Sequence, residues 1–125
     1  MKKILALGIG GFIGSNLRYF ITLKTHALFG NNFPYGTFAV NMLGCFILGF
    51  LAVFGSDVVN LSTNTKLLLG TGMMGALTTF STFSYETFSL MKQSNYKLAF
   101  ISIALNLFIG LIAVWMGLEL AKKLA

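Results

Sequence analysis

The sequence predicts an all-α membrane protein, and two observations carry that prediction. First, 56% of its 125 residues are hydrophobic, 10% are charged and the mean hydropathy is +0.82, which leaves too little polar material to coat a soluble domain. Second, four apolar windows are each long enough to cross a hydrocarbon core of about 30 Å. Because lipid offers no partner to an open strand edge, each window is expected to span as a helix. The windows, which form one domain over residues 1–125, are 4–23, 36–58, 66–91 and 97–121.

The first window, 4–23, lies where a secretory signal peptide would also lie. It is longer than a typical signal-peptide core, and its end carries Arg18 and Lys24 rather than a small-residue cleavage site. We therefore interpret it as a retained membrane helix.

The second window, 36–58, begins just after Pro34, a residue that suits the start of a helix. Asn41 lies one to two turns inside the window, where a polar side chain costs free energy unless it is paired or faces water. Two interpretations remain open for Asn41: a hydrogen bond to another helix, or a place on an ion pathway. The single cysteine, Cys45, excludes an intramolecular disulfide and is interpreted as a small packing residue.

The third window, 66–91, predicts a helix that is broken near its middle. Three glycines weaken its first half and the β-branched pair Thr78 and Thr79 weakens it again, so carbonyls around Gly75 and Thr78 are expected to lack intrahelical donors. Counted from Lys66, Gly75 falls about 13 Å into the membrane, close to the midplane of a core of about 30 Å. A two-fold axis between antiparallel chains lies at the same depth, so two carbonyls from each chain could surround one cation.

Beyond the break, the third window presents a face of aromatic rings and hydroxyl groups. Phe80 and Phe83 are three residues apart and share one side of a helix with Ser84. The positive edge of an aromatic ring can attract a small anion, and the hydroxyls of Ser81 and Thr82 add donors for the same charge. Each hydroxyl could instead bond back to a preceding carbonyl. Taken together, these residues predict an anion pathway.

Three further polar residues lie in the third and fourth windows. Glu86 lies near the end of the third window, so it is expected to reach a membrane interface as a vestibule or surface carboxylate rather than a buried proton carrier. In the fourth window, 97–121, Asn106 lies near the middle and Ser102 one turn before it. The two interpretations that are open for Asn41 are open for Asn106 as well.

Small residues recur at a spacing of four within the windows. Gly10 and Gly14 form one such pair, and Gly72 and Ala76 form another. Since small residues let helix backbones approach closely in lipid, the spacing predicts a tightly packed, oligomeric assembly. The sequence shows no metal cluster, phosphate loop, nucleophile with a base or pair of catalytic carboxylates, so we do not expect an enzyme.

The charges bear on topology. An even number of spans puts both termini and the middle loop at one face, with five cations there and four at the other. This near balance gives almost no positive-inside bias, so dual topology is expected; a weakly biased single orientation is the alternative, especially if Arg18 lies too deep to count. The net charge of +6 is scattered over helix ends rather than gathered in a stripe, so no nucleic-acid partner is expected. The five cations at the face with the termini are Lys2, Lys3, Lys66, Lys122 and Lys123, and the four at the opposite face are Arg18, Lys24, Lys92 and Lys97.

Three runs of residues resemble the Fluc (CrcB) family of bacterial fluoride channels, and the likeness covers the whole chain. The third run is highly specific, whereas the first alone would be weak. The runs are GGFIGSNLRY at 10–19, GTFAVNMLG at 36–44 and GALTTFSTF at 75–83.

The resemblance implies an antiparallel, dual-topology homodimer in a bacterial plasma membrane, crossed by two fluoride pathways. A central structural sodium ion would be bound by the backbone carbonyls of Gly75 and Thr78. Phe80 and Phe83 from opposite subunits would line each pathway. The function implied is passive export of fluoride that enters the cell as the neutral acid and dissociates in the cytoplasm.

The same resemblance implies places for other residues. Asn41 and the hydroxyls of Ser81 and Thr82 would lie near the pathway, and Arg18 would match the family's vestibule arginine. The fourth helix departs from the family pattern, which often has a tyrosine and serines along a polar track. At the corresponding four-residue spacing this sequence has Ser102, Asn106 and Gly110.

Two other classes of protein remain as alternatives. A small dual-topology multidrug or cation exporter fits the size and charge balance, but its mechanism needs a membrane-embedded carboxylate on the first helix, and this sequence has none there. A non-conducting membrane scaffold would explain the glycines and would leave the face of phenylalanines and hydroxyls unexplained.

Overall fold

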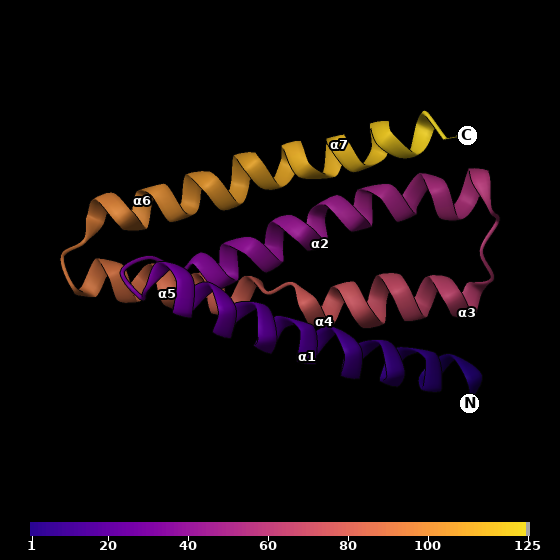
Figure 1. Cartoon of the computed structure of the whole chain (residues 1–125), viewed down its shortest axis with the longest axis horizontal. Coiled ribbons are helices and arrows are strands. Elements are labelled where there is room, and N and C mark those ends of the chain that lie inside the picture. Colours follow the sequence, from indigo (N-terminus) through magenta and orange to yellow (C-terminus); the bar gives the residue numbers. More distant parts are fainter. Residues whose placement is uncertain (125) are drawn as a thin grey trace.

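The computed structural model describes residues 1–124, and these form an all-helical chain (Figure 1). The first predicted window is helix α1 and the second is α2, extended by a π-helical stretch η1. The third window is divided by a break between α4 and α5, and the fourth is one continuous run. The bounds are α1 Lys2–Phe29, α2 Tyr35–Val53, η1 Phe54–Val58, α3 Thr63–Lys66, η2 Leu67–Met74, α4 Gly75–Leu77, α5 Phe80–Lys92, α6 Tyr96–Ala104, η3 Leu105–Ile109 and α7 Gly110–Lys122.

This architecture confirms the prediction of four helical segments with the third broken. Among the described residues, three uninterrupted helices are long and apolar enough to cross a membrane: Lys2–Phe29, Tyr35–Val58 and Tyr96–Lys122. The third window is not among them because its helix is interrupted. The first helix runs six residues further than predicted and ends at Gly30, whose φ of 75° suits a residue without a side chain.

The helices α2 and α3 each begin at a residue that favours a helix start, and for α2 the sequence indicated it. Pro34 directly precedes the first residue of α2. Ser62 is the N-cap of α3, and its side chain accepts a hydrogen bond from the Thr65 N–H at 3.2 Å.

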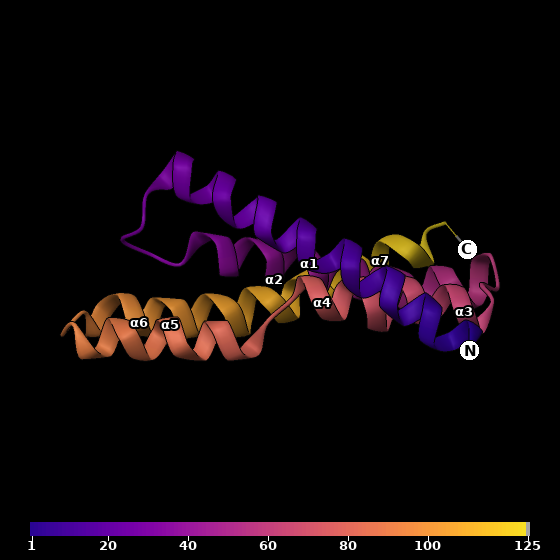
Figure 2. The same cartoon turned by 90° about the horizontal axis from the view of Figure 1, so that it is seen from below.

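The helices lie side by side along one long axis. Figure 1 shows α1 beside α3 and α4, α2 crossing the middle of the molecule, and α5 beside α6; Figure 2 shows the same pairing of α5 with α6 from below. Both termini and the start of α3 lie at one end, and the α5–α6 turn lies at the other. The expected placement of the termini and the middle loop is therefore confirmed.

One charge lies deeper than the topology count assumed. The Arg18 guanidinium reaches the carbonyl of Ala76, which is beside the break in the third span and not at an end of the molecule. With Arg18 set aside, the two ends carry five and three cations. The charge bias between the ends is consequently larger than the sequence count indicated, although it remains small.

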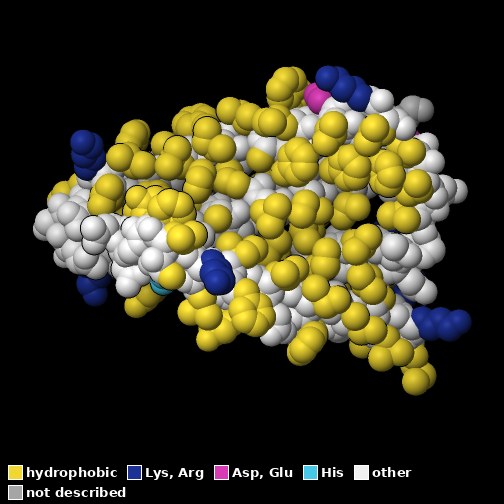
Figure 3. Space-filling view, in the orientation of Figure 1, with side chains coloured by type: hydrophobic (Ala, Val, Ile, Leu, Met, Phe, Trp, Pro, Cys, Tyr) yellow, Lys and Arg dark blue, Asp and Glu magenta, His cyan; other side chains and the backbone are white. Residues whose placement is uncertain are grey.

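Close backbone contacts hold the fold together. A Cβ added at Gly14 would collide with the carbonyl of Met73, and one at Gly10 with the carbonyl of Leu68, so α1 lies directly against η2. The buried core beside this contact consists of Val40, Met74 and Leu77. The small-residue pairing predicted for the first and third spans is thus confirmed. Outside this core, hydrophobic side chains cover most of the face visible in Figure 3, as suits contact with lipid or another chain.

Candidate functional site

The candidate site is built around the break in the third span. Thr78 has φ −81° and ψ 158°, and Thr79 has φ −154° and ψ 121°, so two extended residues separate α4 from α5. Thr79 also begins the second half, because its Oγ1 accepts a hydrogen bond from the Thr82 N–H at 3.1 Å. The break is therefore both the end of one helix and the capped start of the next.

The break diverts two helical donors from their usual acceptors. In an α-helix, each backbone carbonyl accepts a hydrogen bond from the N–H of the residue four positions later. For Gly75 that donor is the Thr79 N–H, which instead donates to Asn41 Oδ1 at 2.9 Å. For Thr78 it is the Thr82 N–H, which donates to the Thr79 side chain. These are the two carbonyls that the resemblance assigns to a cation.

The carbonyl between them is occupied by a side chain. Arg18 Nε donates to the Ala76 carbonyl at 2.9 Å, and Nη2 of the same guanidinium also donates to it. Arg18 therefore places its charge at the carboxyl end of the first half-helix, where the helix dipole is negative. Gly75 is itself exposed, and a Cβ there would meet no atom within 4 Å.

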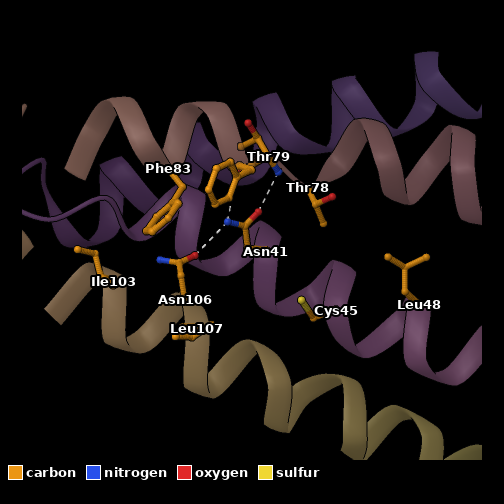
Figure 4. A pocket seen from close by; sticks show the side chains of 10 residues that line it. Asn41, Cys45, Leu48, Thr78, Thr79, Phe83, Ile103, Asn106 and Leu107 are labelled. Atoms are coloured by element: carbon orange, nitrogen blue, oxygen red, sulfur yellow. Dashed lines mark hydrogen bonds between the residues drawn. The ribbon is translucent and has the colours of Figure 1, made fainter. Parts of the chain in front are cut away.

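A cavity of about 550 Å³ opens beside the break (Figure 4). Its lining, which consists of described residues only, includes no charged side chain. Two amides, two threonines and two aromatic rings form one part of the lining, and aliphatic side chains and a thiol form the rest. The lining residues are Asn41, Cys45, Leu48, Thr78, Thr79, Phe80, Phe83, Ile103, Asn106 and Leu107.

Two asparagines form a hydrogen-bonded chain along this wall. Asn41 Nδ2 donates to the Thr79 carbonyl at 3.2 Å and to Asn106 Oδ1 at 3.0 Å, as Figure 4 shows. Asn106 Nδ2 then donates to the Ser102 carbonyl at 3.0 Å. The two interpretations left open by the sequence are therefore compatible, because both amides bond between helices and both line the cavity.

The two phenylalanines differ in their surroundings. Their ring centroids are 5.7 Å apart. Phe83 is half-buried, whereas 79% of Phe80 is exposed. Both line the cavity.

The predicted hydroxyl face lies mostly outside the cavity. Ser81 is exposed, Thr82 is tied to the Thr79 side chain at 3.0 Å, and Ser84 Oγ donates back to the Phe80 carbonyl at 2.9 Å. The back-bonding alternative therefore holds for Ser84 in this chain.

Ser102 and Glu86 lie away from the cavity at the break. Ser102 is fully buried, and its hydroxyl is 3.3 Å from that of Thr87. Glu86 lines a second cavity of about 500 Å³ near the α5–α6 turn, together with His26, Asn31 and Gln93. Its Oε2 is buried and accepts no hydrogen bond from the part of the chain that the structure describes.

Sequence reasoning missed the contact of Arg18 with the break and most of the aliphatic wall. Arg18 and Ala76 are 58 positions apart, and Asn41 and Asn106 are 65 apart. A single sequence carries no signal for such pairs. The only local hint for Arg18 was its four-residue spacing from Gly14, which puts both on the face of α1 that contacts the third span.

Comparisons with known proteins agree with the resemblance in the three runs. The family described as "CrcB-like protein, Camphor Resistance (CrcB)" matches residues 5–118. A protein of Clostridium perfringens named "Fluoride-specific ion channel FluC" is 49% identical over 125 residues, covering 98% of each chain. Proteins of the same name from Dehalococcoides mccartyi and Shewanella loihica are 45% and 42% identical, covering 99% and 96% of this chain and 95% and 96% of theirs. This chain belongs to the CrcB-like family.

Proposed function

We propose that this protein is a fluoride-selective, passive ion channel of a bacterial plasma membrane. The observation that carries the proposal is the cavity at the break, where amide groups and aromatic rings gather without a charged side chain in its lining. Such a wall can replace part of the water around a small anion without binding it so tightly that it stays. The relatives named as fluoride-specific channels support the same function.

The conducting unit in this proposal is an antiparallel homodimer with two pathways. Gly75 and Phe80 are exposed beside the break, at the depth where a two-fold axis in the membrane plane would pass. A second copy would cover them and would bring its own phenylalanines to the open side of the cavity. The small difference between five and three cations at the two ends suits insertion in both orientations.

A structural sodium ion at the dimer centre completes the proposed unit. The diverted donors leave the Gly75 and Thr78 carbonyls available as ligands. Among the described residues, no group of three or more His, Cys, Asp or Glu side chains converges. Neutral carbonyls suit a monovalent ion rather than a divalent ion that prefers carboxylates.

In this proposal the remaining polar residues surround the pathway at different depths. Asn41 and Asn106 line it at the break, and Ser81 and Thr82 lie at the start of α5. Glu86 would stand at a vestibule in the second cavity. Ser102 would act from behind this surface, Ser84 would lie on the exposed side of α5, and Arg18 would hold the break rather than line a vestibule.

The deciding experiment is ion flux from liposomes that contain the purified protein. We expect fluoride efflux down its own gradient, without a proton gradient, and strong rejection of chloride. Chloride flux equal to that of fluoride would contradict the proposal. A requirement for a proton gradient would favour the exporter, and no flux of either ion would favour a scaffold.

Two companion measurements test the assembly. Impermeant reagents should reach a tag on the C-terminus from both sides of the membrane in comparable proportion, whereas labelling from one side only would refute an antiparallel dimer. Rigorous removal of sodium should impair flux or assembly; if neither changes, the sodium site is wrong.

A further inference from the structure

The second cavity, of about 500 Å³, lies between the α1–α2 loop and the end of the α5–α6 hairpin. Figure 2 shows the carboxyl end of α1 and the start of α2 on one side of this region, and α5 with α6 on the other. Four amide side chains line the cavity, together with three titratable groups: His26 from α1, and Tyr85 and Glu86 from α5. The cavity therefore brings an imidazole and a carboxylate to one wall of water-accessible space.

Few charges face this space. His26 and Glu86 are the two lining residues that carry charge between pH 5 and 8, since the phenol of the third titratable group stays neutral in this range. The α1–α2 loop and the start of α6 contribute no titratable side chain to the lining. The nearest lysines along the chain are Lys24 on α1, Lys92 on α5 and Lys97 on α6, and none of them lines the cavity.

The carboxylate of Glu86 is not offset by a neighbouring donor. Its Oε2 is buried and accepts no hydrogen bond from the described residues. With a neutral imidazole opposite it, the lining carries one negative charge. With an imidazolium, the two charges cancel. The net charge of the lining thus depends on the proton of His26.

His26 is suited to gain and lose this proton. Histidine is the side chain whose charge ordinarily changes between pH 5 and 8, and His26 is the one histidine of the chain. It is exposed, so protons reach it from water. It also lies in the last turn of α1, where a positive charge is favourable because the helix dipole is negative. Protonation therefore changes the field in the cavity without disrupting the helix.

We propose that His26 is a proton-sensing residue that raises the entry of fluoride as the pH falls. A negative lining repels an anion from the vestibule, and the imidazolium removes that repulsion. The inference rests on the proposed function and adds a regulation to it, since it assumes that fluoride passes this cavity. Because fluoride enters cells as the neutral acid, such a channel would conduct best under the acidic conditions that favour uptake.

The direct test measures fluoride current through the purified wild-type protein in a planar bilayer. Current is preferable to fluoride loss from liposomes, because the neutral acid crosses lipid unaided at low pH and carries no current. As the pH on both sides falls from about 8 to about 5, the range in which imidazoles are protonated, the current should rise. We expect an increase of about twofold to fivefold, as for one unit charge acting on an ion through several ångströms of water.

Two substitutions fix the charge at this position. His26→Asn is neutral at both pH values, so its current should stay at the alkaline level. His26→Arg is positive at both, so its current should stay at the acid level. Lys24→Gln is the matched control, because it removes a cation two residues earlier that does not line the cavity, and it should keep the rise. Both positions are exposed, so all three variants should assemble as wild type does.

Ionic strength distinguishes an electrostatic effect from a change of shape. At about 1 M of a salt whose anion does not permeate, the screening length falls to about 3 Å. The rise in current on acidification should then shrink in the wild-type protein. A conformational change driven by the same proton would keep its full size.

The outcomes separate this inference from the proposed function. Wild-type current that stays level or falls on acidification overturns the inference and leaves the channel intact. A rise that persists in His26→Asn or His26→Arg, or one that high salt does not reduce, overturns it as well. Wild-type protein that conducts no fluoride at either pH overturns the proposed function, and the inference falls with it.

Discussion

The two halves of the third span come from one apolar stretch and have opposite surroundings. The half before the break, 63–77, lies against α1, where glycines allow contact between the two backbones. The half after it, α5, pairs with α6 and carries the rings and hydroxyls, several of which are exposed. The difference indicates that the two halves have separate roles. The first half packs against α1 and so fixes the position of the break. The second half carries the aromatic rings and hydroxyl groups beside it.

The largest effect is expected from substitutions in α5, the second half of the third span. Phe80→Ile or Phe83→Ile should abolish or severely reduce fluoride flux while the proposed dimer still assembles, because an aliphatic side chain keeps bulk and loses the positive ring edge. Fluoride efflux and dimer yield should be measured on the same preparations.

Phe88→Ile and Phe100→Ile are the matched controls for these variants. Both rings are exposed, at 62% and 71%, and neither lines the cavity at the break. We expect little change in flux from either. If Phe80 and Phe83 only pack, dimer yield should fall and the surviving dimers should conduct normally. A folded, fully conducting double variant would end their assignment to the pathway.

The next largest effect is expected on stability, from a substitution that disturbs the packing of the first half of the third span against α1. Gly14→Val places a side chain against the Met73 backbone, which cannot move aside without displacing η2. We expect a loss of stability at the upper end of about 1–3 kcal/mol, followed by loss of the proposed dimer. Thermal unfolding monitored by size-exclusion chromatography would measure it.

Gly11→Val serves as the control within the same helix, since a Cβ at Gly11 meets no atom within 4 Å. It should leave the unfolding temperature close to that of wild type. Equal destabilisation by both substitutions would show that helix propensity, and not the close contact with η2, accounts for the loss.

A smaller effect is expected where the two halves meet. Arg18→Met should cost about 2 kcal/mol, because it leaves the Ala76 carbonyl without its charged donor. Arg18→Lys should recover part of the loss, since an ammonium supplies charge and a donor without the two-pronged geometry. Stability of the purified protein in increasing denaturant is the measurement. No difference among wild type, Met and Lys would show that the contact contributes nothing to the break.

The smallest effect concerns the cap of α5. Thr79→Val keeps the shape of the side chain and removes the oxygen that accepts from the Thr82 N–H, at an expected cost of about 1 kcal/mol. Loss of the cap would loosen the start of α5 next to the Thr78 carbonyl, so the sodium concentration needed for half-maximal flux should rise. Thr79→Ser should behave as wild type in both measurements. An unchanged sodium requirement in Thr79→Val would separate the cap from the cation site.

The sequence predicted those features that depend on short stretches of chain. Apolar windows predicted four helical segments, and glycines with the Thr78–Thr79 pair predicted a break that the structure places at those two threonines. These succeed because hydropathy and backbone propensity act over a few neighbouring residues. The end of the first helix was placed too early, since no residue between Leu23 and Gly30 stops a helix strongly.

The cavity could not be predicted from the sequence to the same extent. Asn41, Phe80, Phe83 and Asn106 do line one wall, but nothing in a single sequence indicated that both N–H groups of Asn41 would be engaged. Such satisfaction of donors depends on which helices are neighbours and on their register. The roles of the ion-pathway residues remain predictions, as does the sodium site.

The two bonds between Asn41 and the Thr79 peptide also affect the mobility of the break. An interruption in a membrane helix often acts as a hinge, because its free N–H and carbonyl can exchange partners as the segments swing. Here one side chain binds the N–H and the carbonyl of the same peptide, and a threonine hydroxyl caps the helix that follows. These three hydrogen bonds restrain the bend. A pore built on such a bend needs no cycle of opening and closing. We expect its rate of ion flux to be set by the movement of ions between sites and not by a gating rate.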